Sequence, residues 1–171
     1  MLGRVLHLLG QQAKTDELTG ALNRRGLLQR LEDEHASALQ GKTRYALMMV
    51  DVDHFKAIND QHGHAQGDQV LQAVSASLRA ALRSDDLVGR WGGEEFCVLL
   101  PRTQLHDAEP LAQRVADRVA ASGTGIRVTV SIGVSEYGPA DPDLRAVIRR
   151  ADDALYRAKE TGRNRVVTAT V

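Results

Sequence analysis

Apolar runs and helix-period stripes alternate along the chain, and together they predict an order of helices and strands. Residues 45–51 form a near-continuous apolar run that ends in Asp51, which predicts a central strand covered on both faces, since a strand with one face in solvent alternates between apolar and polar residues. Apolar and polar residues alternate over residues 126–134, a pattern that is typical of a strand and predicts a second one. Shorter apolar runs predict further strands at 87–91, 96–101 and 165–170. Helical spacing predicts helices over 2–14, 24–39, 55–61, 66–82, 107–121 and 143–160.

This order of elements predicts an α+β domain with a mostly antiparallel central β-sheet flanked by helices. The chain has 171 residues, 43% of them hydrophobic, which is enough for one compact domain with a buried core. The helix over residues 2–14 is only about 20 Å long, which is short for a coiled coil. We interpret it as the end of a longer helix from an upstream segment.

Charge and cysteine content narrow the classes of function. The 22 acidic and 22 basic residues cancel, so there is no global basic field for DNA or a membrane surface, and phosphate binding requires local groups. The single cysteine, Cys97, excludes an internal disulfide and fits a buried hydrophobe in a reducing compartment. No stretch has the length of a membrane span or the form of a secretion signal, so we expect a cytoplasmic protein.

The segment Gly92-Gly93-Glu94-Glu95-Phe96 reads as the tip of a β-hairpin that carries two carboxylates. Glycine accepts the positive φ that tight hairpin turns use, and the missing side chains leave room for a polyphosphate beside the backbone. Taken alone, these five residues favour a solvent-exposed hairpin tip with two surface glutamates.

Asp51 and Asp53 stand at the end of the buried strand, where unpaired carboxylates are costly. If the hairpin lies on the neighbouring strand, Glu94 and Glu95 crowd Asp51, and two like charges about 4 Å apart repel by roughly 4 kcal/mol at an effective dielectric constant near 20. A proton or a divalent cation relieves that repulsion, and oxygen-only ligands suit Mg²⁺. Asp53 has an alternative, a structural pairing with Lys56 or a nearby arginine.

Four polar residues elsewhere suit a nucleotide. Asn59 and Asp68 have the groups needed to read the edge of a guanine, although Asp68 also suits a helix cap. Lys159 and Arg163 stand at the end of the last predicted helix. They can hold phosphate oxygens, or simply favour the negative end of the helix dipole.

Several blocks, in order, resemble the GGDEF family of diguanylate cyclases from Asp16 to about Val167. The matching blocks are DELTG (16–20), NRR (23–25), DVDHFKAIND (51–60), HGHAQGD (62–68), RWGGEEF (90–96), VSIGV (130–134) and ADDALYRAKETGRNRV (151–166). The resemblance implies a palm-like domain, of the class III nucleotidyl cyclase or ferredoxin-like type. It divides the chain into the end of an upstream signalling helix (1–14) and a catalytic domain (15–171).

The resemblance also implies roles for individual residues. Asp51, Glu94 and the backbone carbonyl of Val52 match the ligands of Mg²⁺ or Mn²⁺, and Glu95 matches the residue that accepts the proton of the 3′-hydroxyl. A metal-ligand role for Glu95 is the alternative. The substrate-binding positions are Asn59 and Asp68 for guanine, Leu71 for the apolar wall of its pocket, His64 near the substrate, Gly92 and Gly93 at the hairpin tip, and Lys159 and Arg163 for phosphates.

Arg83 and Asp86 have the spacing of the family's product-inhibition site, RxxD, and Arg114 falls where a supporting arginine is often found. An arginine can contact guanine O6 and N7 with both arms, and a carboxylate can accept from guanine nitrogens. An isolated RxxD is otherwise a surface ion pair worth less than about 1 kcal/mol.

The resemblance therefore implies an enzyme that condenses two GTP into cyclic di-GMP and releases two pyrophosphates. One domain holds one substrate, so catalysis requires a homodimer, with an upstream sensor or receiver domain as the expected regulator. A silent receptor of cyclic di-GMP is the alternative from another class, although it has no need for Asp51, Glu94 and Glu95. An adenylyl or guanylyl cyclase of the same palm fold is a third, weaker interpretation.

Overall fold

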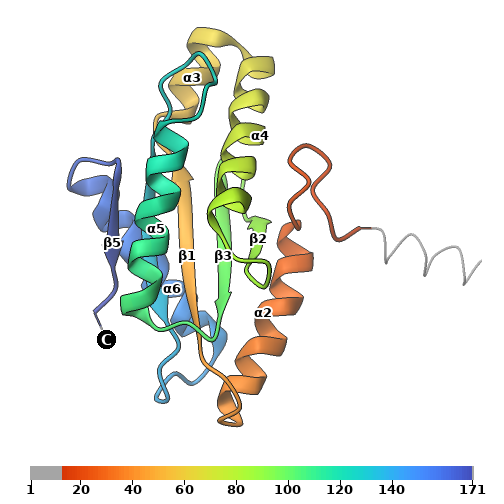
Figure 1. The fold of residues 1–171 in the computed structure, drawn as a ribbon, viewed down its shortest axis with the longest axis vertical. Coiled ribbons are helices and arrows are strands. Elements are labelled where there is room, and N and C mark those ends of the chain that lie inside the picture. The colour runs from red at the N-terminus through yellow and green to blue at the C-terminus, as the bar shows by residue number, and fades with distance from the viewer. Residues whose placement is uncertain (1–12, 171) are drawn as a thin grey trace, which may run out of the picture.

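The structure is a computed structural model that describes residues 13–170. The helices and strands of that range follow one another along the chain as Figure 1 shows. They are α2 (Arg24–Leu39), β1 (Tyr45–Val52), α3 (Phe55–His62), α4 (His64–Ala81), β2 (Leu87–Arg90), β3 (Glu95–Pro101), α5 (Leu105–Ala120), β4 (Val130–Glu136), α6 (Leu144–Glu160) and β5 (Arg165–Thr168). Most of the helix predicted over residues 2–14 lies outside the described range, and Ala13 and Lys14 are in a turn.

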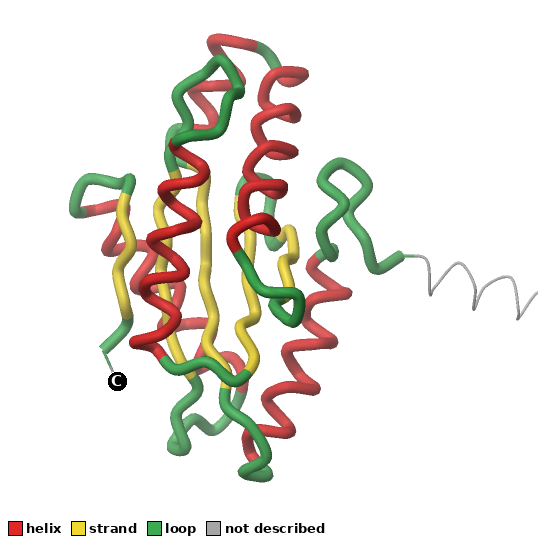
Figure 2. Tube along the Cα trace, viewed as in Figure 1, coloured by secondary structure: helices red, strands yellow, loops and turns green. Residues whose placement is uncertain are grey.

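The strands form one sheet in the order β2-β3-β1-β4-β5. The pairings β1–β3, β1–β4 and β2–β3 are antiparallel, and only β4–β5 is parallel. Figure 2 shows the strands as a central layer with helices on both sides. The prediction of an α+β domain with a mostly antiparallel sheet is confirmed.

Strand β1 is buried along its whole length because helices cover both faces of the sheet. Its alternate residues Ala46, Met48 and Val50 join a core with α4 and α5, and Tyr45, Leu47 and Met49 join a second core with α2 and α6. Both sets are apolar, which explains the unbroken hydrophobic run. Asp51 continues the second set, so the two-residue period of a strand turns its carboxylate toward the α6 side.

Gly133 sets the distance between β4 and α6. A Cβ atom at this position would lie 2.1 Å from the carbonyl oxygen of Ala151 and 2.2 Å from the amide nitrogen of Leu155, both in α6. Only glycine allows that approach of helix to strand. The close packing brings the end of α6, which carries Lys159, against the end of β1.

The observed strand β4 starts later than the sequence pattern predicts. Residues 126–129 are outside any strand, because β1 ends at Val52 and the partner of Val52 on β4 is Val130. Val128 is nevertheless buried in the core, so its apolar character reflects packing and not strand pairing. Within residues 13–170, no helix combines the length and the apolar character needed to cross a membrane.

Candidate active site

Asp51 and Glu95 face each other across the pairing of β1 with β3. Directly paired residues of antiparallel strands project from the same face of the sheet, with Cβ atoms about 5 Å apart. The amide N–H of Val52 donates to the carbonyl oxygen of Glu94 at 3.2 Å, which extends the pairing to the hairpin tip. The sheet thus brings Asp51 and Glu95, which are 44 positions apart in the sequence, to one place, the arrangement expected if the hairpin lies on the neighbouring strand.

A cavity of about 190 Å³ opens at the end of β1. Its lining combines the three predicted metal ligands with the two predicted phosphate contacts: Asp51, Val52, Glu94, Lys159 and Arg163. Asp53, His54, Phe55 and Lys56 complete it. The Lys159 ammonium donates to Oδ2 of Asp51 at 2.8 Å.

Burial and like charge shape the electrostatics of this site. Burial raises the pKa of the Asp51 carboxyl, and the hydrogen bond and positive charge of Lys159 oppose that rise. The pKa of Glu95 is also raised, first by burial and then by the charge of Asp51, and Asp152 of α6 adds to it. The site therefore holds more negative charge than Lys159 neutralises, which favours a proton or a cation there.

The donor set fits a hard divalent cation. Asp51, Glu94 and Val52, the three predicted ligands, all line the same cavity, and the first two bear carboxylates. Within residues 13–170, no group of three or more His, Cys, Asp or Glu side chains is arranged to hold a metal ion. Two carboxylates with open positions suit Mg²⁺, which usually keeps water and substrate phosphate among its ligands.

The hairpin tip differs from its prediction in one respect. Gly92 and Gly93 are exposed, but neither adopts a positive φ, so the turn does not use the conformation that favours glycine. The turn closes instead through the N–H groups of Trp91 and Gly92, which both donate to the carbonyl of Glu95. A Cβ atom on Gly93 would meet nothing within 4 Å, so the space beside the tip is open.

Arg90 ties this tip to the turn that precedes α2, a contact that the sequence reasoning did not find. Its Nη2 donates to the carbonyl of Gly93 at 2.8 Å, and its Nη1 pairs with Asp16 at 3.3 Å. Asp16 in turn accepts from the hydroxyl and the amide of Thr19. The only signal was that both residues belong to blocks of the family resemblance.

The predicted guanine pair is split between two helices. Asn59 is on α3, and its Oδ1 is buried without a hydrogen-bond partner among the described residues. A Cβ atom on Gly67 of α4 would lie 1.8 Å from that oxygen, so Gly67 makes the room for the amide. Asp68 follows Gly67 and is exposed. His64 and Leu71 share a helix face with Asp68 by their spacing, His64 exposed and Leu71 buried in the core.

The two residues of the predicted inhibitory site, Arg83 and Asp86, form hydrogen bonds with each other. Arg83 Nε and Nη2 donate to Oδ2 and Oδ1 of Asp86 at 3.2 and 3.0 Å, and the Arg83 amide donates to Oδ2 at 2.8 Å. The Asp86 side chain has no exposed surface, whereas that of Arg83 is half exposed. Nη2 of Arg83 also donates to the hydroxyl of Thr103. The guanidinium of Arg114 donates to the carbonyl of Ala81 at the end of α4, two residues before Arg83.

Asp53 is held differently from the expected pairing with Lys56 or an arginine. Its carboxylate accepts from the hydroxyls of Thr129 and Ser131 and from the amide of Asn164. These partners lie more than 70 positions away in the sequence, so no local pattern could identify them.

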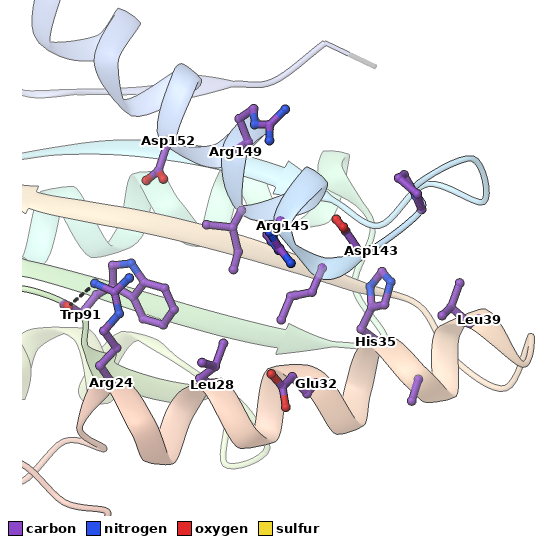
Figure 3. Close-up of a pocket in the computed structure, with 14 residues that line it drawn as sticks. Arg24, Leu28, Glu32, His35, Leu39, Trp91, Asp143, Arg145, Arg149 and Asp152 are labelled. Carbon is purple, nitrogen blue, oxygen red and sulfur yellow. Dashed lines mark hydrogen bonds between the residues drawn. The ribbon is translucent and has the colours of Figure 1, made fainter.

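A second cavity, of about 770 Å³, lies between α2 and α6 and contains none of the predicted site residues (Figure 3). Trp91 lies at one end of it, with the guanidinium carbon of Arg24 4.3 Å from the ring centroid. Size alone would make this groove the first candidate for a site, and acidic and basic side chains line it too, but the directly paired carboxylates Asp51 and Glu95 lie at the other cavity, with the predicted phosphate contacts.

The chain belongs to the GGDEF family: residues 13–165 match the family model described as "Diguanylate cyclase, GGDEF domain". It is 45% identical to diguanylate cyclase DgcM of Escherichia coli K12 over 97% of its own length, and 43% identical to diguanylate cyclase DgcP of Pseudomonas aeruginosa over 93%. The chain spans 41% of the length of DgcM and 24% of that of DgcP.

Solved structures agree with this membership. The GGDEF domain of DgcB from Caulobacter crescentus, in complex with c-di-GMP, superposes with a TM-score of 0.85 at 34% identity. The match covers 91% of this chain and 95% of that one. The predicted family and its palm-like fold are therefore confirmed.

Proposed function

We propose that this domain is a diguanylate cyclase, which joins two GTP molecules into cyclic di-GMP and releases two pyrophosphates. The observation that carries the proposal is the single cavity shared by Asp51, Val52, Glu94, Lys159 and Arg163. Glu95 lies opposite Asp51 beside it. Carboxylates for a metal and cations for phosphates are the two requirements of phosphoryl transfer.

Asp51, Glu94 and the carbonyl of Val52 would hold the cation, Mg²⁺ or Mn²⁺. When bound, the cation neutralises charge at the α-phosphate and lowers the pKa of the attacking hydroxyl. Lys159 and Arg163 would hold the phosphate oxygens. The Lys159 ammonium uses one of its three N–H donors on Asp51, which leaves the other two for the nucleotide.

Glu95 would accept the proton of the 3′-hydroxyl. The oxygen of that hydroxyl forms a bond to the α-phosphorus, the bond from this phosphorus to the leaving pyrophosphate breaks, and the proton passes to the carboxylate. A raised pKa supports this role, because a general base is most effective when its pKa approaches the working pH. Catalysis otherwise consists of positioning the two reactants.

Asn59 and Asp68 would select guanine over other bases, with Leu71 beneath the ring and His64 near the substrate. The buried, unpartnered Oδ1 of Asn59 supports this role, because it leaves the other half of the amide free to face a ligand. The open space at Gly93, beside Gly92, would take the triphosphate.

Two such domains would face each other in an antiparallel homodimer, since each holds one GTP. The segment 1–14 would connect the domain to an upstream sensor or receiver domain that sets this geometry. The Arg90 bridge between Asp16 and Gly93 supports the link, because it joins the start of the described domain to the hairpin tip.

Cyclic di-GMP would also act as an inhibitor at Arg83 and Asp86, with Arg114 in support. Strand β2 runs from Leu87, next to Asp86, to Arg90, just before the hairpin tip. Product at Arg83 would therefore act on residues directly continuous with the active site.

The test is incubation of the protein with GTP and Mg²⁺, followed by detection of cyclic di-GMP. We expect synthesis, and its loss in Asp51→Ala and Glu95→Ala. A protein that binds cyclic di-GMP but makes none would favour the alternative function, a receptor. Unchanged GTP turnover in both variants would overturn the assignment of the site.

A further inference from the structure

We propose that Asp53 is a positioning residue, which fixes the loop Gly162–Asn164 and so holds Arg163 at the cavity. The kinetic part of this inference rests on the proposed diguanylate cyclase function. The structural part does not.

Both oxygens of the Asp53 carboxylate accept hydrogen bonds. Oδ1 accepts from the Ser131 hydroxyl at 2.6 Å, and Oδ2 accepts from the Thr129 hydroxyl at 2.7 Å and the Asn164 amide at 3.0 Å. The residue is 5% exposed. One side chain at the end of β1 thus joins the start of β4 to the loop between α6 and β5.

The loop needs this support because its backbone is strained. Gly162, Arg163 and Asn164 have φ values of 126°, 62° and 45° in succession. Glycine adopts such angles freely and asparagine tolerates them, but they are unfavourable for arginine. Such a conformation persists only where the surroundings fix it.

Amides of the loop donate two hydrogen bonds, and Nε of Arg165 donates a third to the carbonyl of Arg163 at 3.0 Å. The amide of Arg163 donates to the carbonyl of Ala158, which closes the end of α6. The amide of Asn164 donates to Asp53. The second bond alone connects the loop to β1, the strand that carries Asp51.

The consequence is a fixed distance between the acidic and basic halves of the cavity. Asp51 and Asp53 are two residues apart, and Arg163 precedes the residue that Asp53 holds. Lys159 and Arg163 stand one on each side of the end of α6, and both line the cavity with Asp51. Loss of the Asp53 contact would free Arg163 while leaving Asp51 in place.

A role for Asp53 as a metal ligand is the competing explanation, since it also lines the cavity. Replacement of Asp53 by asparagine distinguishes the positioning role from the metal-ligand role. The Oδ1 of an asparagine can accept from Thr129 and Asn164, while its Nδ2 donates to Ser131, whose hydroxyl rotates to accept. Asparagine therefore preserves the positioning but removes the negative charge that a metal would need.

The experiment compares Asp53→Asn and Asp53→Ala with the unaltered protein. We expect Asp53→Asn to keep kcat/KM for GTP within about threefold. We expect Asp53→Ala to raise KM for GTP about tenfold, with a smaller fall in kcat, as for a lost ground-state contact. Equal loss of activity in both variants would overturn the proposal in favour of a metal ligand.

Ser131→Ala, with Ser135→Ala as its control, repeats the test without altering the carboxylate. Both serines are fully buried on β4, but the Ser135 hydroxyl donates to the carbonyl of Val147 in α6 and does not touch the loop. We expect a rise in KM for GTP only in Ser131→Ala. The same rise in both would show that general stability of β4, and not Asp53, is responsible.

Hydrogen exchange of the Asn164 amide, followed by NMR, tests the contact without any substrate. The amide should be protected in the unaltered protein and in Asp53→Asn, and exchange at least tenfold faster in Asp53→Ala. Unchanged protection in Asp53→Ala would overturn the proposal even if the enzyme is active. Protein without cyclase activity that still shows the expected exchange would sink only the proposed function.

Discussion

Asp51 and Glu95 are direct partners across β1 and β3, and both carboxyls have pKa values raised by burial. Only one ammonium, that of Lys159, bonds to this pair within residues 13–170. The Asp51–Glu95 pair therefore carries more negative charge than its one bonded ammonium neutralises, which opposes folding but suits a divalent cation, and Lys159 and Arg163 supply positive charge for phosphate oxygens in the adjoining cavity.

Glu95→Gln should make the protein more stable at neutral pH while abolishing synthesis of cyclic di-GMP. A carboxyl whose pKa is higher in the folded than in the unfolded state weakens folding once it is ionised. The penalty is absent below the unfolded-state pKa, near 4.5, and grows as pH rises through the folded-state value. Because Glu95 is only half-buried, solvent screens much of this penalty, so we expect a small rise in Tm at pH 7.5 and none at pH 4.

Glu109→Gln provides the control, because Glu109 is exposed on α5. Thermal unfolding of the unaltered protein, Glu95→Gln and Glu109→Gln at pH 7.5 and pH 4 measures the change in Tm that each substitution causes. A Glu95→Gln protein that is less stable at neutral pH would contradict the origin given for the raised pKa.

Lys159→Met should destabilise the domain, since it leaves the Asp51 carboxylate buried without its partner. The side chain of Asp51 is 7% exposed and that of Lys159 is 32%, so we expect a loss of about 1–3 kcal/mol, between the values for buried and surface pairs. Urea denaturation measures it. Mg²⁺ without nucleotide should restore part of the loss, because a cation at Asp51 takes the place of the ammonium.

Lys42→Met, at an exposed position, is the matched control and should change neither stability nor the effect of Mg²⁺. If both lysine variants respond to Mg²⁺ alike, the ion does not act at Asp51.

Gly67→Ala should weaken the use of GTP without unfolding the domain. Alanine is favoured over glycine in a helix by about 1 kcal/mol, but its Cβ would overlap Oδ1 of Asn59 and force that amide out of place. Loss of one hydrogen bond to guanine should raise KM for GTP about tenfold. Steady-state kinetics test this, with Gly123→Ala as a control, since a Cβ there meets nothing within 4 Å. An unchanged KM in Gly67→Ala would remove Asn59 from the guanine site.

Arg83→Ala should weaken binding of cyclic di-GMP at least tenfold, because one two-armed contact to guanine is lost. Asp86→Asn should lower stability more than Arg83→Ala does, since Asp86 is buried and also accepts from the Arg83 amide. Titration calorimetry and thermal unfolding separate the two effects. Tight binding that persists in Arg83→Ala would place the product elsewhere.

Sequence patterns predicted the elements well where local physics decides them. Helix α2 begins and ends at the predicted residues, Arg24 and Leu39, because Asn23 caps its first turn and its buried positions, among them His35, recur at helical spacing. Strand β1 followed from its apolar run. The error in β4 came from Ile126 and Val128, which pack against the core without a neighbouring strand.

The residues of the site also divide into those that the sequence predicted and those that it could not reveal. Asp51, Glu94, Lys159 and Arg163 were predicted as one group, because the blocks of the resemblance name them together. The partners of Asp53 and the bridge from Arg90 to Asp16 depend on how distant segments meet, which no spacing along the chain reveals. The glycines of the hairpin were expected both for a positive φ and for the room that they leave; neither has a positive φ, and the space beside Gly93 is open.

The bidentate pair of Arg83 with Asp86 has a consequence for regulation. A ligand that needs both groups must first separate them, so the domain carries its own competitor for the site where product is proposed to bind. The strength of that internal pair would set the cyclic di-GMP concentration at which inhibition begins. Substitutions that only weaken the pair, such as Thr103→Val beside it, would then make the domain more sensitive to its product.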